Sequence, residues 1–171
     1  MGPKQAMRNG ILKTFQFSGR ASRSEFWYFA PVAVLPVILG LYLVPWHKIE
    51  LFGIWRWLGV MVLGLPLLSA GWRRINDTGE NGQMILLPFM PIILLWVGYQ
   101  AILWFAVGTA FVGVGVVGMV IGFGTLFMLF PLYFAALLIS FISLGPVIGQ
   151  LVLPSTPGPN RFGPIPHEVT P

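Results

Sequence analysis

Cysteine is absent from this 171-residue chain, and no Lys, Arg, Asp, Glu or His occurs between Asn81 and Asn160. The lack of cysteine excludes disulfides, thiol catalysis and thiolate metal sites. The uncharged run is far too long for the core of a small soluble domain, because about 20 apolar helical residues already cross the roughly 30 Å hydrocarbon layer of a bilayer. The chain is therefore predicted to lie in a membrane.

Charge is scarce throughout the sequence. Charged residues make up 9% of the chain and hydrophobic residues 56%, whereas soluble domains contain roughly 25% charged residues. The formal net charge is +5, and five of the ten basic residues precede residue 24. A basic segment of this kind predicts attraction to an anionic lipid surface, not to nucleic acid, which usually requires a basic face on a folded domain.

The apolar run also lacks the side chains that chemistry inside a membrane requires. Proton pumps and ion-coupled transporters place Asp, Glu, His or Lys within their spans. The two histidines, His47 and His167, are expected in a loop and in the tail, so they provide no pair of haem ligands. We predict no metal site, no cofactor and no catalysis, while an enzyme acting at the charged cytoplasmic face stays open as an alternative.

Apolar segments long enough for membrane helices occur at about residues 27–44 and 51–72. The next stretch, 84–153, has 70 residues and would be about 105 Å long if it were entirely helical. Three crossings fit this length with modest tilt, whereas two would be far longer than a bilayer requires. We predict an all-α, polytopic transmembrane bundle of about five spans, with four as the alternative.

Breaks in the long stretch are expected near residues 106–110, where Gly108 interrupts, and at Phe130-Pro131, because proline disfavours helix in the residue before it. Neither break has a polar loop. The chain then divides into four parts: an N-terminal segment 1–26, a bundle 27–153, a cytoplasmic loop 73–83 within that bundle, and a Pro/Gly-rich tail 154–171.

Basic residues near the ends of the spans predict the orientation, because cytoplasmic segments carry the excess of Lys and Arg. Seven lie on the side of the N-terminus: Lys4, Arg8, Lys13, Arg20, Arg23, Arg73 and Arg74. Five spans would place the tail on the other side, which would then hold Lys48, Arg56 and Arg161. The N-terminus is predicted to be cytoplasmic. Apolar residues at helical spacing near it predict either a short helix on the inner leaflet or a partly ordered segment.

Three polar clusters interrupt the apolar chain, at 17–28, 73–82 and 154–164. In the first, Ser22 or Ser24 can cap the helix that follows. The second contains two turn signals and predicts a compact loop between helices. The third has four prolines, which forbid helix there.

The charged residues of the first two clusters form the candidate site. They are Arg20, Arg23, Glu25, Arg73, Arg74 and Asp77. One interpretation joins the arginines into a site for a phosphate-bearing headgroup or an acidic partner, because arginine forks hold phosphate bidentately. The other interpretation is a set of ion bridges that brace helix ends. Because the arginines outnumber the acids by two, we expect Arg20 and Arg74 to lie together, paired with Glu25 and Asp77, beside a site for an anion.

The three clusters resemble the signature of the small bacterial inner-membrane proteins grouped as domain of unknown function 805, the YhaH-like family. The family pattern reads G-R-A-x-R-x-E-[YF]-W, then R-R-x-x-D-T-G-x-x-G, then T-P-G-x-N-R-[YF]-G. This chain matches at Gly19–Trp27, Arg73–Gly82 and Thr156–Gly163, the last of which includes Asn160 and Arg161. The resemblance implies a multi-pass bacterial inner-membrane protein and brings no established activity. Family members usually have about one span between the second and third motifs, where three are expected here.

Glycines recur within the long apolar stretch. Gly108, Gly115 and Gly122 are spaced by seven residues, and Gly118 forms a G-x-x-x-G pair with Gly122. On one helix they would line one face and allow a neighbouring backbone to approach closely. The neighbour would be another helix of this chain or a second protomer.

Two functional hypotheses follow from these patterns. The preferred one is a non-catalytic membrane protein that binds membrane lipid, with anionic lipid as one candidate, or a protein partner, as an accessory subunit would. The alternative is a small transporter or channel for an uncharged solute. No nucleic-acid partner is expected.

Overall fold

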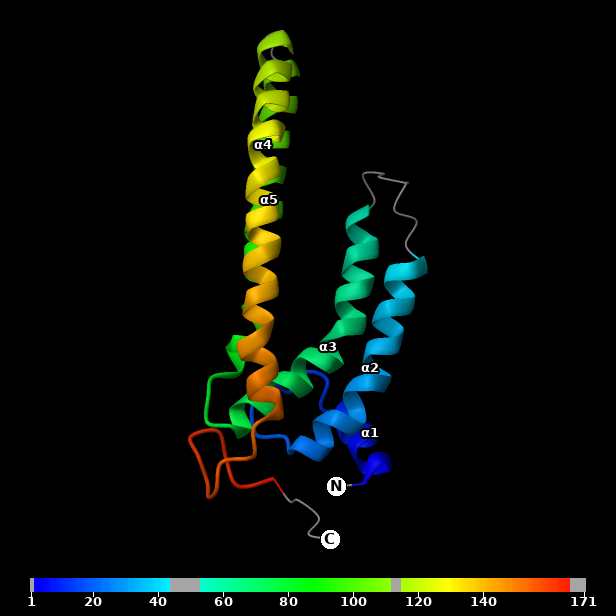
Figure 1. Ribbon diagram of the computed structural model, residues 1–171. Helices are drawn as coiled ribbons and strands as arrows, with labels where there is room; N and C mark the ends of the chain where they lie inside the picture. Colours follow the sequence, from blue (N-terminus) through cyan, green and yellow to red (C-terminus); the bar gives the residue numbers. More distant parts are fainter. Residues whose placement is uncertain (1, 44–52, 112–114, 167–171) are drawn as a thin grey trace. The chain divides into compact units, whose positions relative to one another are not determined.

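The computed structural model describes residues 2–43, 53–111 and 115–166, and it is helical (Figure 1). The elements in chain order are α1 (Pro3–Leu12), α2 (Arg23–Leu43), α3 (Gly53–Asp77), the 3-10 helix η1 (Gly82–Leu86), α4 (Met90–Phe111) and α5 (Gly115–Val152). Extended pairing within the described ranges is limited to an isolated bridge between Asn160 and Gly163. The prediction of an all-α fold is confirmed.

The helices belong to two compact units. The first contains α1, α2, α3, η1 up to Ile85, and the end of the chain from Gly149 onward. The second runs from Leu86 to Ile148 and contains α4 and most of α5. All three polar clusters therefore lie in the first unit.

The helix α1 packs against α2 through its small residues. Ala6 and Gly10 are buried, and the ring of Phe29 lies where a Cβ on Gly10 would be, at 2.4 Å. Ile11 and Leu12 at the end of α1, and Phe15 just after it, are exposed. The sequence left a helix and a partly ordered segment open, and the structure has the helix. Its position on the inner leaflet stays a prediction.

A small apolar core joins α2 to α3, which lie next to each other in Figure 1. It consists of five buried residues, with Met7, Leu67 and Leu151 packed around them: Phe26, Phe29, Ala30, Ala33 and Ala70. The alanines allow the two helices to approach closely, as small residues do in membrane bundles. This core lies in the first half of α2 and near the end of α3, directly beside the charged residues.

Among the described residues, three helices are long and apolar enough to cross a membrane, over Arg23–Tyr42, Leu58–Asp77 and Phe127–Val152. A shorter apolar helix covers Met90–Phe105. Many of their large apolar side chains are exposed, which suits contact with lipid because hydrocarbon tails are as apolar as these side chains. The prediction of a membrane-spanning helical protein is confirmed.

The predicted division of residues 84–153 into three spans is wrong, because the structure has two helices there. The helix α4 continues past Gly108 to Phe111, and α5 continues through Pro131. Proline is tolerated inside membrane helices, where neighbouring groups and local adjustment satisfy the carbonyl that loses its partner. The residues around Pro131 are also apolar and offer no turn chemistry.

The expected cytoplasmic loop 73–83 is shorter than predicted. The helix α3 extends to Asp77, and η1 begins at Gly82. The extension is supported by an ion pair one turn apart, between Arg74 and Asp77, of the kind that stabilises helices at i, i+3. Gly79 then ends the helix in the left-handed region, with φ at +90°, where a residue with a Cβ would be strained.

The glycines expected on one helix face lie on two helices. Gly108 is in α4, and a Cβ added to it would meet nothing within 4 Å. Gly115, Gly118 and Gly122 are in α5, where Gly118 is buried. The seven-residue repeat therefore does not form a single face, because Gly108 lies in α4 and the other three glycines lie in α5. Close packing of the α5 glycines stays a prediction.

Among the glycines whose surroundings the structure describes, Gly82 has the least space around it. A Cβ at this position would lie 2.1 Å from Cδ1 of Trp72, whose ring is itself held edge-on to Phe17, with the centroids 5.4 Å apart. We expect Gly82→Ala to destabilise the protein by about 1–3 kcal/mol through overpacking, seen as a lower thermal midpoint in detergent. Gly59→Ala is the control, because nothing lies within 4 Å of that position. Equal midpoints for the two variants would contradict this packing.

Candidate functional site: a polar cluster at the meeting point of three motifs

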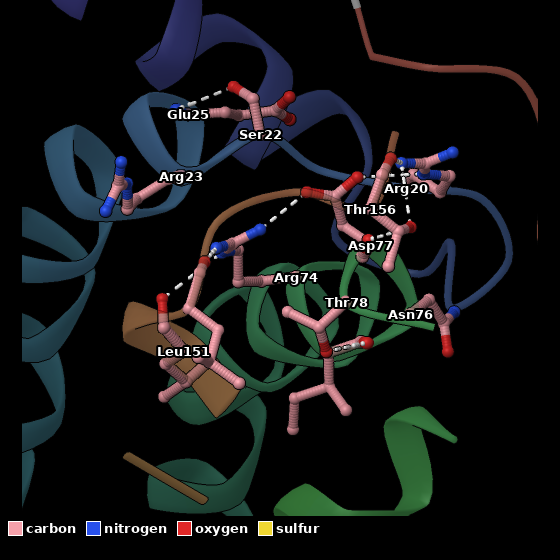
Figure 2. A network of polar contacts seen from close by, with 12 residues as sticks. Arg20, Ser22, Arg23, Glu25, Arg74, Asn76, Asp77, Thr78, Leu151 and Thr156 are labelled. Atoms are coloured by element: carbon pink, nitrogen blue, oxygen red, sulfur yellow. Dashed lines mark hydrogen bonds and ion pairs between the residues drawn. The ribbon is translucent and has the colours of Figure 1, made fainter. Parts of the chain in front are cut away.

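Asp77 is the centre of the cluster, and Figure 2 shows it between Arg20 and Arg74. Its Oδ1 accepts from Nε of Arg20 at 2.8 Å, and its Oδ2 accepts from Nη1 of Arg74 at 2.5 Å. The Asp77 and Arg74 side chains are 0% exposed and that of Arg20 is 1% exposed. One carboxylate thus balances two arginines from the first and second motifs in a place that water does not reach.

A second buried pair links α2 to α3. Nη1 of Arg73 donates to Oε1 of Glu25 at 3.1 Å. Glu25 lies in the first turn of α2, where a negative charge is favourable, and its backbone N–H donates to Oγ of the capping Ser22 at 3.2 Å. Within the part of the chain that the structure describes, Nε and Nη2 of Arg73 have no hydrogen-bond partner. Glu25 is therefore the main compensation for a fully buried cation.

The three buried arginines are matched by two buried carboxylates. Backbone carbonyls at the end of α5 accept further hydrogen bonds from the arginines. Arg74 donates from Nε to the carbonyl of Leu151 at 3.2 Å and from Nη2 to the carbonyl of Leu153. Arg23 donates to the carbonyl of Val152 at 3.3 Å. The last carbonyls of a helix have no partners within it and carry a partial negative charge. The arginines thus cap α5.

The end of α3 is capped in turn by the other two motifs. The backbone N–H of Ala21 donates to the carbonyl of Arg73 at 3.0 Å. From the tail, the N–H and the hydroxyl of Thr156 both donate to the carbonyl of Asp77, at 3.1 and 2.8 Å. Nδ2 of Asn160 donates to the carbonyl of Asn76 at 2.9 Å. Backbone carbonyls at the end of α3 therefore accept hydrogen bonds from residues before α2 and after α5, and those at the end of α5 accept from arginines on α2 and α3.

Asn76 and Arg20 complete the network through backbone groups. Oδ1 of Asn76 accepts from the N–H of Gly82 at 2.9 Å, and its Nδ2 donates to the carbonyl of Gly19 at 3.2 Å. Arg20 donates to the carbonyls of Gly158 at 2.7 Å and Thr156 at 2.9 Å. The sequence analysis missed these partners, because a backbone carbonyl has no signature in a sequence. The only signal was the presence of Asn76 and Thr156 inside the motifs.

The structure brings five of the six charged candidates together and changes one pairing. Arg20 and Arg74 do lie side by side, but both bind Asp77, and Glu25 pairs with Arg73. Arg23 is different: its side chain is exposed, and Figure 2 shows it apart from Asp77. It lines an open cleft of about 340 Å³ with Ser24, Trp27 and Tyr28. This cleft, Arg23 to Tyr28 on α2, is the accessible part of the candidate site.

Comparison with known families identifies the family of this chain. The family model described as "Protein of unknown function (DUF805)" matches residues 14–164, which include all three motifs. The chain belongs to the DUF805 family. A similar relative of this DUF805 protein is the inner membrane protein YhaI of Escherichia coli strain K12, which is 36% identical over 92 residues, covering 48% of this chain and 70% of the relative. The YhaI protein of Escherichia coli O157:H7 matches to the same extent. No solved structure matches the chain.

The DUF805 tail lies on the same side of the membrane as the first motif. Hydrogen bonds between Arg20 and the backbone of Thr156 and Gly158 cannot join groups on opposite sides of a hydrocarbon layer roughly 30 Å thick. Arg161 also approaches the second motif, with Nη2 3.4 Å from the carbonyl of Gly79, and its guanidinium lies over the ring of Phe162. The preferred count of five spans, which separates the tail from the N-terminus, is wrong. The alternative of four spans fits.

Reporter fusions at the two ends of this DUF805 chain should therefore report the same compartment. An even number of crossings returns the chain to its starting side, and with the tail included that side holds all the Lys and Arg residues except Lys48 and Arg56. Because basic residues favour the cytoplasmic side, we expect both fusions to be cytoplasmic. Two reporters measure the location of each end. One is a phosphatase that is active only outside the inner membrane, and the other is a fluorescent protein that folds inside. Reporters on opposite sides would contradict the four-span arrangement.

Proposed function

We propose that this DUF805 protein is a non-catalytic inner-membrane protein that binds lipid, or a protein partner as an accessory subunit, at the membrane face where the three motifs meet. The proposal rests on a difference in burial among the arginines. Arg20, Arg73 and Arg74 are buried and committed to internal bonds, whereas Arg23 lines an open cleft beside them. A binding function requires an accessible group on a rigid support, and this face provides both.

The state of the two carboxylates supports binding over catalysis. A general acid or base must reach a substrate atom within hydrogen-bond distance. Asp77 is completely buried and holds two arginines, and Glu25 is buried and holds a third. Both act as counter-charges in the folded protein, which leaves the exposed groups of the cleft to meet a ligand.

The orientation is part of the same proposal. Eight of the ten basic residues lie on the side of the three motifs when the tail is placed there: Lys4, Arg8, Lys13, Arg20, Arg23, Arg73, Arg74 and Arg161. This asymmetry favours the cytoplasmic side for the cluster. The cytoplasmic leaflet carries anionic lipids that attract basic segments, so the cleft would face a negatively charged surface.

The proposal is tested by purifying the protein from bacterial inner membrane in a mild detergent and identifying what accompanies it by mass spectrometry. We expect a lipid class or a protein to be enriched over its share of the whole membrane extract. An accompanying composition equal to that of bulk membrane would contradict the proposal. Uptake of an uncharged solute by liposomes containing the protein, and not by empty ones, would favour a transporter instead.

A further inference from the structure

We infer that the cleft at the start of α2 binds the phosphodiester headgroup of an anionic phospholipid, with Arg23 as the phosphate ligand. The inference rests on the proposed function and names the ligand of that site. The cleft has a volume of about 340 Å³, and the described residues that line it are Arg23, Ser24, Trp27 and Tyr28. This set combines a cation, a hydroxyl donor and two aromatic rings, which is the chemistry of a headgroup at the membrane surface.

Of the motif arginines on α2 and α3, Arg23 is the one that an external anion can reach. It makes no ion pair among the described residues, and its contact with the carbonyl of Val152, at 3.3 Å, engages Nη1 alone. A guanidinium has five N–H donors in a planar fork, and this side chain is exposed, so it can offer further donors to a phosphate. The neighbouring Glu25 is buried against Arg73, so its charge is turned away from the cleft.

The apolar surface below the cleft favours a lipid over free phosphate. Trp27 and Tyr28 are 45% and 48% exposed, and Val32, Leu35 and Leu39 continue the exposed surface along α2. Tyr28, Val32 and Leu35 follow at spacings of four and three, so they share one helix face. From Arg23 to Leu39 the helix rises about 24 Å, which exceeds the roughly 15 Å depth of one hydrocarbon leaflet. An acyl chain can lie along this face while its phosphate reaches Arg23.

Trp27 and Tyr28 fix the depth of the site. Indole and phenol rings settle at the boundary between headgroups and hydrocarbon because one edge is polar and the rest apolar. The ring of Trp27 packs edge-on against the buried Phe26, with centroids 5.3 Å apart, so one side of the ring contacts a core residue. Arg23, one turn nearer the N-terminus, then lies at the level of the phosphates.

The test uses the full-length protein in mild detergent, titrated with phosphatidylglycerol and observed by native mass spectrometry. Arg23→Gln should weaken phosphatidylglycerol binding at least tenfold, because a hydrogen bond to a charged group is lost. Arg23→Lys should bind at an intermediate level, because the charge is kept and the fork is lost. Arg8→Gln is the matched control: it removes the same charge from the exposed side of α1 without altering the cleft, so it should lower binding far less than Arg23→Gln.

A second variant, Tyr28→Glu, leaves Arg23 in place and puts a negative charge in the cleft. It should also lose phosphatidylglycerol at least tenfold while keeping the thermal midpoint, because Tyr28 is half exposed. Equal binding by Arg23→Gln and Arg8→Gln would overturn the inference. So would displacement of the lipid by millimolar inorganic phosphate, which would identify a free anion as the ligand. If the unaltered protein still carries an enriched lipid or protein partner in either case, the proposed function stands and only this site is wrong.

Discussion

Replacing Asp77 by asparagine is expected to cost about 3–5 kcal/mol of stability, the range seen when one partner of a buried ion pair is removed. The carboxylate holds Arg20 and Arg74 together, and both side chains are almost completely buried. The amide of asparagine has the same shape but no charge, so two buried cations would remain without their counter-charge. We expect a large fall in the thermal midpoint in detergent and a reduced yield of monodisperse protein.

Glu80→Gln is the matched control for this change, since it removes the same charge three residues later at an exposed position and should have little effect. Exchanging the pair, as Arg74→Asp with Asp77→Arg, should not restore stability. Asp77 also binds Arg20, and Arg74 also binds carbonyls at the end of α5, so reversing one pair breaks the other contacts. Restoration by the exchange would mean that the pair acts alone, and unchanged stability of Asp77→Asn would contradict the burial.

The second large effect is expected at Glu25. Glu25→Gln leaves Arg73 as a buried cation whose Nε and Nη2 already lack partners, and we expect a loss of about 3–5 kcal/mol. Arg73→Met combined with Glu25→Gln removes the uncompensated charge and replaces it with an apolar chain of similar length. Because buried ion pairs can be replaced by apolar residues with little loss, the double variant should recover most of the stability.

A double-mutant cycle measures this coupling from the unfolding free energies of the single and double variants. The predicted effect has a definite sign: adding Arg73→Met stabilises the protein that Glu25→Gln alone destabilised. Simple addition of two losses would contradict the prediction, and it would mean that Arg73 contributes through contacts other than its bond to Glu25.

Much of the fold could be predicted from residue patterns. The absence of charge from Asn81 to Asn160 identifies a membrane protein, because burying a charge in hydrocarbon is costly. The start of the first long helix follows from Ser22 as a cap and Glu25 in the first turn. The three motifs, taken together, also predicted the family.

The span count could not be predicted in the same way. The helix α5 contains Pro131 and is 38 residues long, which is about 57 Å at 1.5 Å per residue. This length exceeds the thickness of a bilayer, and thickness alone therefore predicted an additional break in this stretch. The rule that proline ends a helix was derived in water, where the lost hydrogen bond is costly. In a membrane helix neighbouring groups compensate for this loss, so the rule overestimates the tendency of Pro131 to end the helix. The tail contacts that decide the number are made by Thr156, Gly158 and Asn160, in a segment whose Pro and Gly content is typical of flexible chains.

The pairing within the cluster was also beyond sequence reasoning. Counting charges predicts a surplus of two arginines, and among the buried residues the surplus is one, because Arg23 is exposed. It cannot show that the carbonyls of Leu151 and Leu153 act as acceptors for Arg74, because every residue has a carbonyl and only the fold decides which ones lack partners. Burial separates Arg23 from the other arginines, and burial depends on packing that the motif alone does not describe.

The capping of α5 by Arg74 sets an order of events during biosynthesis. The Leu153 carbonyl lies 79 residues after Arg74; at about 5–20 residues per second, a ribosome needs roughly 4–16 seconds to make that stretch. Throughout this time the α2–α3 hairpin carries arginines whose final acceptors do not yet exist. These side chains must stay hydrated until the last span has been inserted. Until the end of α5 is in place, Arg74 has Asp77 as its partner but lacks the two carbonyl acceptors that the finished fold supplies.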